Sequence, residues 1–277
     1  RFKALYRFMV RKTLLTPIIL KSLGYFYRHS KITSKLLKPK KINSKVLLIA
    51  GCVQPSLAPN INHSIKNILA KLNIEVLESS QGQCCGALDQ HLAASSDAMK
   101  KVKQNIDRWT HQLESGVDSI ISSASGCGVM IKDYPKLFKS SDPYFQKAQF
   151  VSSKTEDIAE FLSSKDLSGL HLTELNVTYH EPCTMQHGQQ LGGLVESILS
   201  QFGYTKKPVK DSHICCGSAG TYSIFETKIS SQLRTNKIKH LNASEPNMIV
   251  TSNIGCLMHL QKGSSIPVKH WVELLDV

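Results

Sequence analysis

The chain has 277 residues, 41% of them hydrophobic, which predicts a globular protein of two domains and excludes disordered and fibrous classes. Its formal net charge of +13 arises in one place, because residues 1–45 hold 13 of the 34 lysines and arginines and no acidic residue. The rest of the chain is neutral, with 21 basic and 21 acidic residues, so we expect no nucleic-acid-binding surface on its fold.

Residues 1–44 are predicted to form a basic helical connector, in which apolar residues such as Phe2, Leu5 and Tyr6 are interleaved with the charges. Contact with a partner or an upstream domain is the favoured interpretation, and an anionic membrane surface is the alternative. The best apolar stretch, residues 13–20, is interrupted by Pro17, so neither a membrane-spanning helix nor a secretory signal is expected. We therefore expect a cytoplasmic protein, at most peripheral on the cytoplasmic face of the inner membrane.

Strands and helices alternate from residue 46 onward. Residues 65–72 and 99–109 have the apolar spacing of helices that bury one face, and the short apolar runs between them are typical of buried strands. The strands expected in this half are residues 46–49, 74–77 and 119–121. This order predicts right-handed crossovers within a small parallel sheet.

The second half repeats this order after a polar, serine-rich linker, roughly residues 140–172, with one helical stretch at 158–162. Strands are expected at residues 175–179 and 248–250, and helices at residues 194–202 and 229–241. The predicted fold class is α/β, with two duplicated Rossmann-like halves: a first cysteine-rich domain at 45–150 and a second at 170–277.

Eight cysteines repeat one spacing in both halves. In each half a cysteine is followed, after 31 residues, by an adjacent pair and a glycine, and the two copies are offset by 131 residues. A fourth cysteine, preceded by glycine, follows after 41 residues in the first half and 39 in the second. The two sets are Cys52, Cys84, Cys85 and Cys127, and Cys183, Cys215, Cys216 and Cys256. Because these residues follow predicted strands, where open α/β sheets bind ligands, we expect one cofactor or metal site in each half.

Disulfides, structural zinc and an iron-sulfur cluster are the main uses that such cysteines allow. Disulfides are disfavoured because eight cysteines in 277 residues is far below the density of secreted scaffolds. Zinc sites are commonly built from Cys-x-x-Cys pairs, which this sequence lacks. A cluster of several metal atoms can use both adjacent cysteines, and the neighbouring glycine lets backbone amides approach its sulfurs. An iron-sulfur cluster is therefore favoured over zinc, and a metal-free redox dithiol is a further alternative.

The motifs around the cysteines resemble the duplicated "CCG" cysteine-rich domain of heterodisulfide reductases and their relatives. They are more specifically similar to the iron-sulfur subunits of glycolate oxidases. The segments that carry this likeness are Gly51-Cys52-Val53-Gln54-Pro55, Ser125-Gly126-Cys127-Gly128, Cys215-Cys216-Gly217-Ser218-Ala219-Gly220-Thr221-Tyr222 and Asn253-Ile254-Gly255-Cys256.

The resemblance implies the C-terminal part of such a subunit, preceded in that family by a ferredoxin-like domain. It further implies iron-sulfur clusters of the 4Fe-4S type on the eight cysteines, and partner subunits whose FAD oxidises glycolate to glyoxylate. The chain would then pass electrons from these flavin subunits to a membrane acceptor, with no catalytic acid, base or nucleophile of its own. Two alternatives remain. The first is a subunit of a related lactate, glycerol-3-phosphate or heterodisulfide oxidoreductase that reduces a disulfide or a quinone directly. The second is a zinc-stabilised assembly module.

The sequence departs from the CCG pattern at its last position. That pattern ends in Cys-x-x-Cys, whereas Met130 and His259 occupy the final position here, which leaves four cysteines in each half instead of five. His259 is a candidate fifth ligand, although Met130 at the matching position argues against a shared requirement. His180, His187 and His213 also lie near cysteines, and we interpret them as loop residues with ordinary hydrogen bonds rather than as groups that tune a cluster.

Overall fold

The computed structural model describes residue 32, residues 35–78 and residues 84–276. Most of the basic connector expected over residues 1–44 lies outside this part, and residues 35–43 within it form neither helix nor strand. No helix of the described part is long and apolar enough to cross a membrane.

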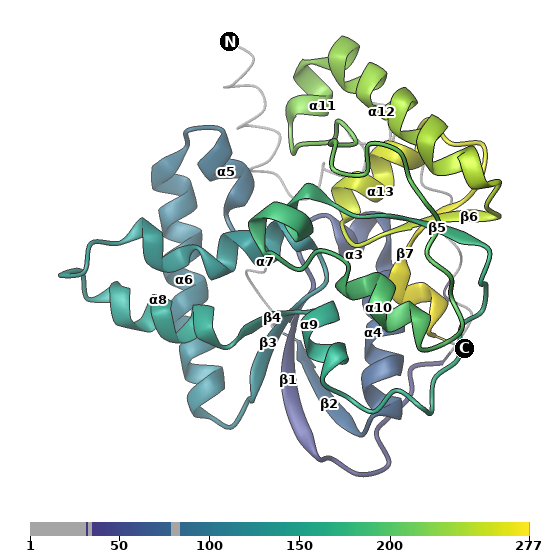
Figure 1. Cartoon of the computed structure of the whole chain (residues 1–277). Coiled ribbons are helices and arrows are strands. Elements are labelled where there is room, and N and C mark those ends of the chain that lie inside the picture. The colour runs from purple at the N-terminus through teal and green to yellow at the C-terminus, as the bar shows by residue number, and fades with distance from the viewer. Residues whose placement is uncertain (1–31, 33–34, 79–83, 277) are drawn as a thin grey trace.

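A four-stranded parallel sheet of order β2-β1-β3-β4 forms the centre of the first half (Figure 1). Strand β1 (Ser44–Ile49) pairs with β2 (Ile74–Glu78) on one side and with β3 (Ser119–Ser122) on the other. Strand β4 (Thr155–Asp157) extends the sheet beyond β3. The helical segments of this half are α3 (Gln54–Leu57), α4 (Pro59–Lys71), α5 (Ala87–His91), α6 (Ser95–Glu114), α7 (Ser125–Lys132), η1 (Tyr134–Leu137), α8 (Tyr144–Ser153) and α9 (Ile158–Ser163).

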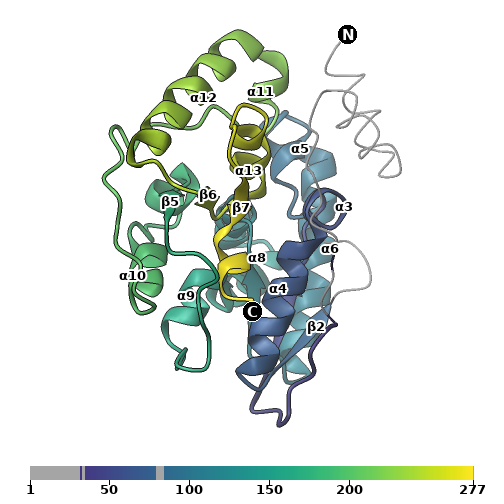
Figure 2. The ribbon, with the colours of Figure 1, turned by 90° about the vertical axis from the view of Figure 1, so that its right-hand side faces the viewer.

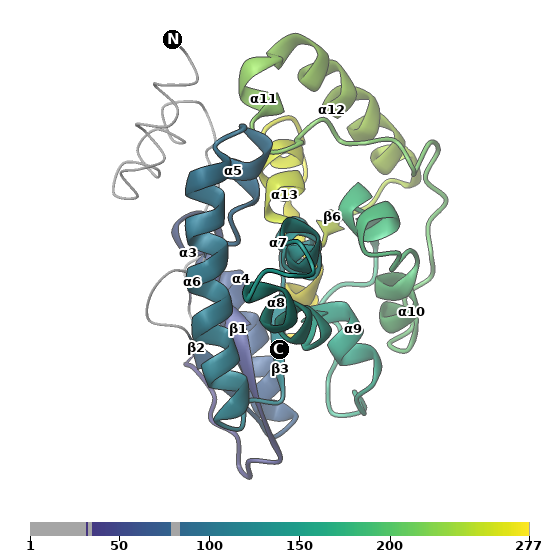
Figure 3. The ribbon, with the colours of Figure 1, turned by 90° about the vertical axis from the view of Figure 1, so that its left-hand side faces the viewer.

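Helices cover both faces of this sheet, and β1 is accordingly apolar and buried over residues 46–49. Val46 and Leu48 join a core that includes α4, whereas Leu47 and Ile49 join a second core that includes α6 and α8. Figure 2 shows α4 on one side of the sheet, and Figure 3 shows α6 and α8 on the other. In open α/β sheets, ligands bind at the loops that follow the carboxyl ends of the strands.

The second half holds a three-stranded parallel sheet of order β5-β6-β7. Strands β5 (Val177–His180), β6 (Met248–Thr251) and β7 (Val268–His270) repeat the pairing of β1, β3 and β4, and no described strand takes the place of β2. The helical segments here are the π-helical turn η2 (Thr184–Gly188), α10 (Leu194–Ser200), α11 (Tyr222–Phe225), α12 (Thr227–Leu241), η3 (Asn242–Ser244), α13 (Ile254–Gln261) and η4 (Trp271–Leu274). The predicted α/β fold with small parallel sheets in two similar halves is confirmed.

The segment expected as a linker adds regular structure to the first half, namely α8, β4 and α9. Asp157 ends β4 and caps α9, because its carboxylate accepts from the Ala159 amide at 2.9 Å. The Glu160 carboxylate reaches back to the Asp157 amide at 2.8 Å, which completes a capping box. His270 and Glu273 form a second capping box between β7 and η4. The last strand of each sheet is therefore followed by a capping box.

The two halves pack with the carboxyl ends of their sheets facing each other. The Ser125 amide, just beyond β3, donates to the Ser252 carbonyl, just beyond β6, at 3.3 Å. The His270 Nε2 lies 2.9 Å from the Ser123 carbonyl oxygen, and the burial of this imidazole lowers its pKa to about 4. A neutral His270 therefore donates this hydrogen bond from one half to the other. The loops that carry the cysteines are brought together by this arrangement.

Candidate metal centres

The four cysteines of the first half gather beyond the carboxyl ends of β1, β2 and β3. Cys85 Sγ lies 3.3 Å from Cys127 Sγ, and the thiols of Cys52 and Cys84 are hydrogen-bonded to each other. The hydrogen bond from Cys52, helped by the Gly86 amide and the charge of Lys101, lowers the pKa of Cys84 to about 6 despite its burial. Hydrogen bonding to Cys84 and to Cys85, together with burial, raises the pKa of Cys52 and of Cys127 respectively. The four thiols are therefore close enough to change each other's pKa, as expected for ligands of one metal group.

Two polar side chains hold the backbone of the first cysteine pair. Asn105 on α6 donates from Nδ2 to the Cys84 carbonyl at 2.9 Å and to the Tyr134 hydroxyl at 3.0 Å. The Tyr134 hydroxyl in turn donates to the Cys85 carbonyl at 2.9 Å. Both side chains are almost fully buried, so they fix the position of the pair from behind.

The four cysteines of the second half gather at the equivalent place. Hydrogen bonds link Cys183 to Cys215, Cys215 to Cys216, and Cys216 to Cys256. The hydrogen bond from Cys216, with contributions from His180 and Asn253, lowers the pKa of Cys256 to about 5 despite its burial. The Asn253 amide nitrogen lies 3.6 Å from Cys256 Sγ. Each half therefore brings its whole predicted set of cysteines together.

The last cysteine of each set lies in the first turn of a helix. Cys127 is in α7 and Cys256 is in α13, and both helices follow central strands of their sheets. A side chain at Gly126, next to Cys127, would approach Asn253 Oδ1 to 3.9 Å, and Asn253 itself contacts Cys256. The two sites are thus neighbours across the junction of the halves.

Glycine at the end of the second cysteine pair is required by its backbone. Gly217 has a φ of +93°, and a Cβ placed there would lie 2.6 Å from the Ser230 carbonyl oxygen. The Gly217 amide donates to Cys215 Sγ at 3.3 Å, and its carbonyl accepts from the Ser230 hydroxyl at 2.8 Å. The equivalent Gly86 also has a positive φ, of +86°. The Cys-Cys-Gly sequence thus makes a turn that aims an amide at the first sulfur of each pair.

A lysine lies close to each set of thiols. Lys101 on α6 pairs with Asp89 at 2.5 Å, and its charge acts on Cys84. Lys237 on α12 is 2% exposed and donates to the carbonyl of Asp211 at 2.7 Å. Burial lowers the pKa of Lys237, and the thiols of Cys216 and Cys215 oppose this effect. Both cations offset part of the negative charge that a set of thiolates would carry.

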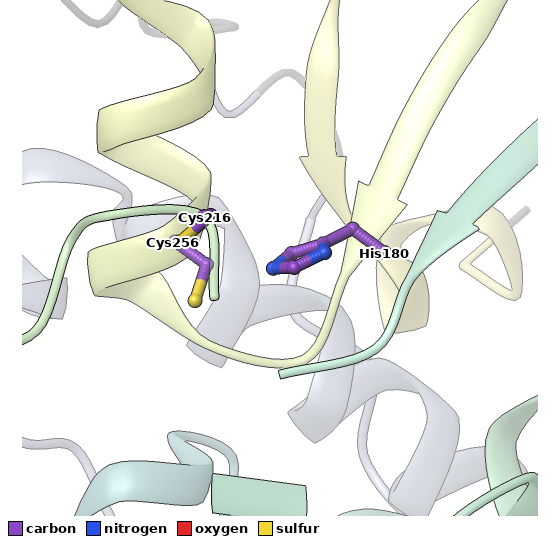
Figure 4. Close-up of side chains that lie close together, drawn as sticks. All are labelled: His180, Cys216 and Cys256. Carbon is purple, nitrogen blue, oxygen red and sulfur yellow. The ribbon is translucent and has the colours of Figure 1, made fainter. Parts of the chain in front are cut away.

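The histidines near the cysteines differ sharply in their surroundings. His187 and His213 are exposed, as expected of residues with ordinary surroundings. His259, the candidate fifth ligand, is buried with its Nε2 3.1 Å from the Ser230 hydroxyl. His180 is the exception, because it lies in one group with Cys216 and Cys256 in which all ligand atoms are within 4.8 Å of one another (Figure 4). The sequence interpretation missed this contact, although His180 stands only three residues before Cys183.

The donor set fits a thiophilic metal group. All eight cysteines are free thiols, and Cys85, Cys216 and Cys256 are buried. The Nε2 atom of His180 is buried and meets no hydrogen-bond partner of good geometry in the described part of the chain, so it is available to bind a ligand. Soft thiolates, with backbone amides directed at them, are the donors that iron-sulfur clusters use.

Comparison with known proteins agrees with this chemistry. The family described as "CCG: Cysteine-rich domain" matches residues 46–132 and 177–261, one copy in each half. The chain therefore belongs to the CCG cysteine-rich family.

This chain covers different shares of the proteins to which it is similar. The glycolate oxidase iron-sulfur subunit of Escherichia coli K12 is 39% identical over 88% of this chain, which spans 60% of that protein. Lactate utilization protein A of Bacillus licheniformis is 28% identical over 84% of this chain and 99% of its own length. The solved structure of a proposed Asp/Glu racemase from Yersinia pestis aligns with a TM-score of 0.38 at 14% identity, over 83% of this chain and 95% of that one.

Proposed function

We propose that this chain is the iron-sulfur electron-transfer subunit of an oxidoreductase complex of the glycolate oxidase type. The observation that carries the proposal is the convergence of four thiols in each half, described above, in a chain that is 39% identical to the E. coli subunit. Electron transfer requires clusters held in place rather than an acid, a base or a nucleophile. We accordingly propose no catalytic acid, base or nucleophile in this chain.

The eight cysteines are the proposed ligands. Cys52, Cys84, Cys85 and Cys127 would hold one group and Cys183, Cys215, Cys216 and Cys256 the other, each of the 4Fe-4S type. Such clusters supply one-electron oxidation and reduction when bound. The chain's own part is to present thiolates and to direct the amides of Gly86 and Gly217 at sulfur.

In this proposal the electrons come from partner subunits. Their FAD oxidises glycolate to glyoxylate, and the chain passes the electrons on to a membrane acceptor from the cytoplasmic face. The support is the E. coli relative, which is named as a subunit of a glycolate oxidase. Because the chain spans 60% of that relative, an upstream ferredoxin-like domain is part of the same proposal.

Lactate is the second candidate substrate of the complex. The lactate utilization protein of B. licheniformis matches this chain over 99% of its own length. Its identity of 28% is lower than the 39% to the glycolate oxidase subunit, and we therefore favour glycolate.

The test is substrate-driven reduction of the chain within its complex. The full-length protein is co-purified with its flavin subunits without oxygen, and glycolate or lactate is added while EPR spectra are recorded. A reduced cluster signal that appears with glycolate supports the proposal, and one that appears only with lactate favours the second candidate. A protein that holds stoichiometric zinc and shows no signal with either substrate, or with dithionite, would be an assembly module instead.

A further inference from the structure

A buried histidine makes the two cysteine sites chemically different. His180 is the last residue of β5 and is 3% exposed. Its Nε2 atom is enclosed and meets no hydrogen-bond partner of good geometry among the described residues, and the imidazole acts on the Cys256 thiol, whose pKa it helps to lower. Leaving a buried donor or acceptor unpaired costs about 1–3 kcal/mol, and a bound ligand is one way in which such an atom is satisfied.

The imidazole is directed at the sulfur site. Figure 4 shows its ring extending from the end of β5 toward Cys216 and Cys256. The ligand atoms of these three residues lie within 4.8 Å of one another, and all three side chains are buried. Imidazole nitrogen and cysteine thiolate are known to serve together as ligands of one iron-sulfur cluster.

The first half has no nitrogen at the equivalent position. Sheet pairing places Ile49 opposite Ser122 in the first half and His180 opposite Thr251 in the second, at the matching ends of β1 and β5. Ile49 is 3% exposed and belongs to an apolar core. At the end of β1, therefore, the first site has an apolar side chain where the second site has an imidazole, and its candidate ligands are the four thiols.

His259, the fifth ligand that the sequence suggested, uses one of its ring nitrogens to contact Ser230. Its Nε2 lies 3.1 Å from the Ser230 hydroxyl and 3.3 Å from the Ser230 carbonyl oxygen. Through Ser230 it supports the turn at Gly217, and it is not part of the group of three ligand atoms formed with Cys216 and Cys256. His180 is thus the better-placed nitrogen.

We propose that His180 Nε2 is a ligand of the cluster in the second cysteine site, whereas the first site is ligated by thiolates alone. The inference rests on the proposed function, because it presupposes that both sites hold clusters. A neutral imidazole brings no negative charge, and histidine ligation raises cluster potentials. The second site is therefore the one that accepts electrons at the higher potential.

The test is to detect histidine nitrogen at the reduced cluster. The full-length protein is produced with ¹⁵N-histidine in an otherwise ¹⁴N background, purified without oxygen, reduced with dithionite and measured by pulsed EPR. The wild type is expected to show a ¹⁵N coupling of the strength of a coordinated imidazole. His180→Cys, which offers a thiolate in its place, is expected to keep its iron and sulfide and to lose this coupling. His259→Gln, a change at a second buried histidine near the cysteines of this half, is expected to retain it.

Each outcome decides the inference separately from the proposed function. Iron and sulfide bound without a ¹⁵N coupling in the wild type overturn the role of His180 and leave the electron-transfer proposal intact. A coupling that survives in His180→Cys, or disappears in His259→Gln, assigns the nitrogen to another histidine and also overturns the role of His180. Protein without iron and sulfide overturns the proposed function itself. The wild-type measurement needs no variant to fold.

Discussion

Replacing Gly217 by alanine tests whether the second cysteine pair depends on its glycine turn. The new Cβ would meet the Ser230 carbonyl oxygen at 2.6 Å and Leu233 Cβ at 3.0 Å, both in α12. Contacts below 3.0 Å with backbone require movement of the turn or of α12. The Gly217 amide, which donates to Cys215 Sγ, would move with it.

Two contributions set the size of the effect. A left-handed conformation costs a residue with a Cβ about 1–2 kcal/mol. Overpacking a filled site costs about 1–3 kcal/mol more, so Gly217→Ala is expected to lower the free energy of unfolding by about 2–5 kcal/mol. Gly116 provides a matched control, because its φ is +94° and a Cβ there would meet nothing within 4 Å. Gly116→Ala is expected to lose only the conformational contribution, about 1–2 kcal/mol.

Urea unfolding of the two variants, followed by circular dichroism, measures this difference. Both substitutions remove the same freedom from the unfolded chain, so that effect cancels in the comparison. Gly217→Ala is also expected to lower the iron content, whereas Gly116→Ala is not. The reasoning is refuted if the two variants lose the same stability and bind the same amount of iron.

Further substitutions address the ligands, the residues that support them and the junction of the halves. Cys85→Ser and Cys216→Ser should each lower the iron bound at one site, measured by metal analysis, and unchanged iron in both would remove them from the ligand set. Tyr134→Phe leaves the Cys85 carbonyl without its donor and should cost about 1–3 kcal/mol in urea unfolding, whereas Tyr144→Phe, at an exposed bond to Asp107, should cost far less. Burial raises the pKa of Asp157 from 3.8 to about 6, although the Ala159 amide, Gln189 and Lys132 oppose this and Glu160 adds to it. The folded state then holds this proton more tightly than the unfolded state, so stability falls as pH rises from about 4 to about 6, by on the order of 3 kcal/mol from this group. Asp157→Asn should remove that share of the pH dependence, and an equal stability difference from wild type at pH 4 and pH 7 would contradict the assignment.

The regular strands of the fold were predictable because their sequence signal is local. The apolar runs at 46–49, 119–121 and 248–250 are confirmed as β1, β3 and β6. Strands β4 and β7 were missed, since each has three residues and β4 reads Thr-Glu-Asp, with no apolar alternation. Pairing with a neighbouring strand, which is a tertiary interaction, makes such segments strands.

The cysteines of the two sites could be predicted, because they belong to the sequence repeat. The equal spacing of the cysteines indicated two sites, and the structure gathers each set as expected. The position of His180 depends on the direction of the last side chain of β5, which no spacing between cysteines specifies. One signal was available in the sequence. The residue that corresponds to His180 in the first copy, 131 positions earlier, is Ile49. A histidine present in one copy only indicates that the two sites differ in their ligands.

The central claim, that the two sets of thiols hold iron-sulfur clusters, is tested most directly by the composition of the purified protein. Iron, zinc and acid-labile sulfide are measured on protein isolated without oxygen, with EPR spectra recorded before and after dithionite. We predict iron with matching sulfide and a signal that changes on reduction. Stoichiometric zinc, without sulfide and without a redox-dependent signal, would contradict the claim.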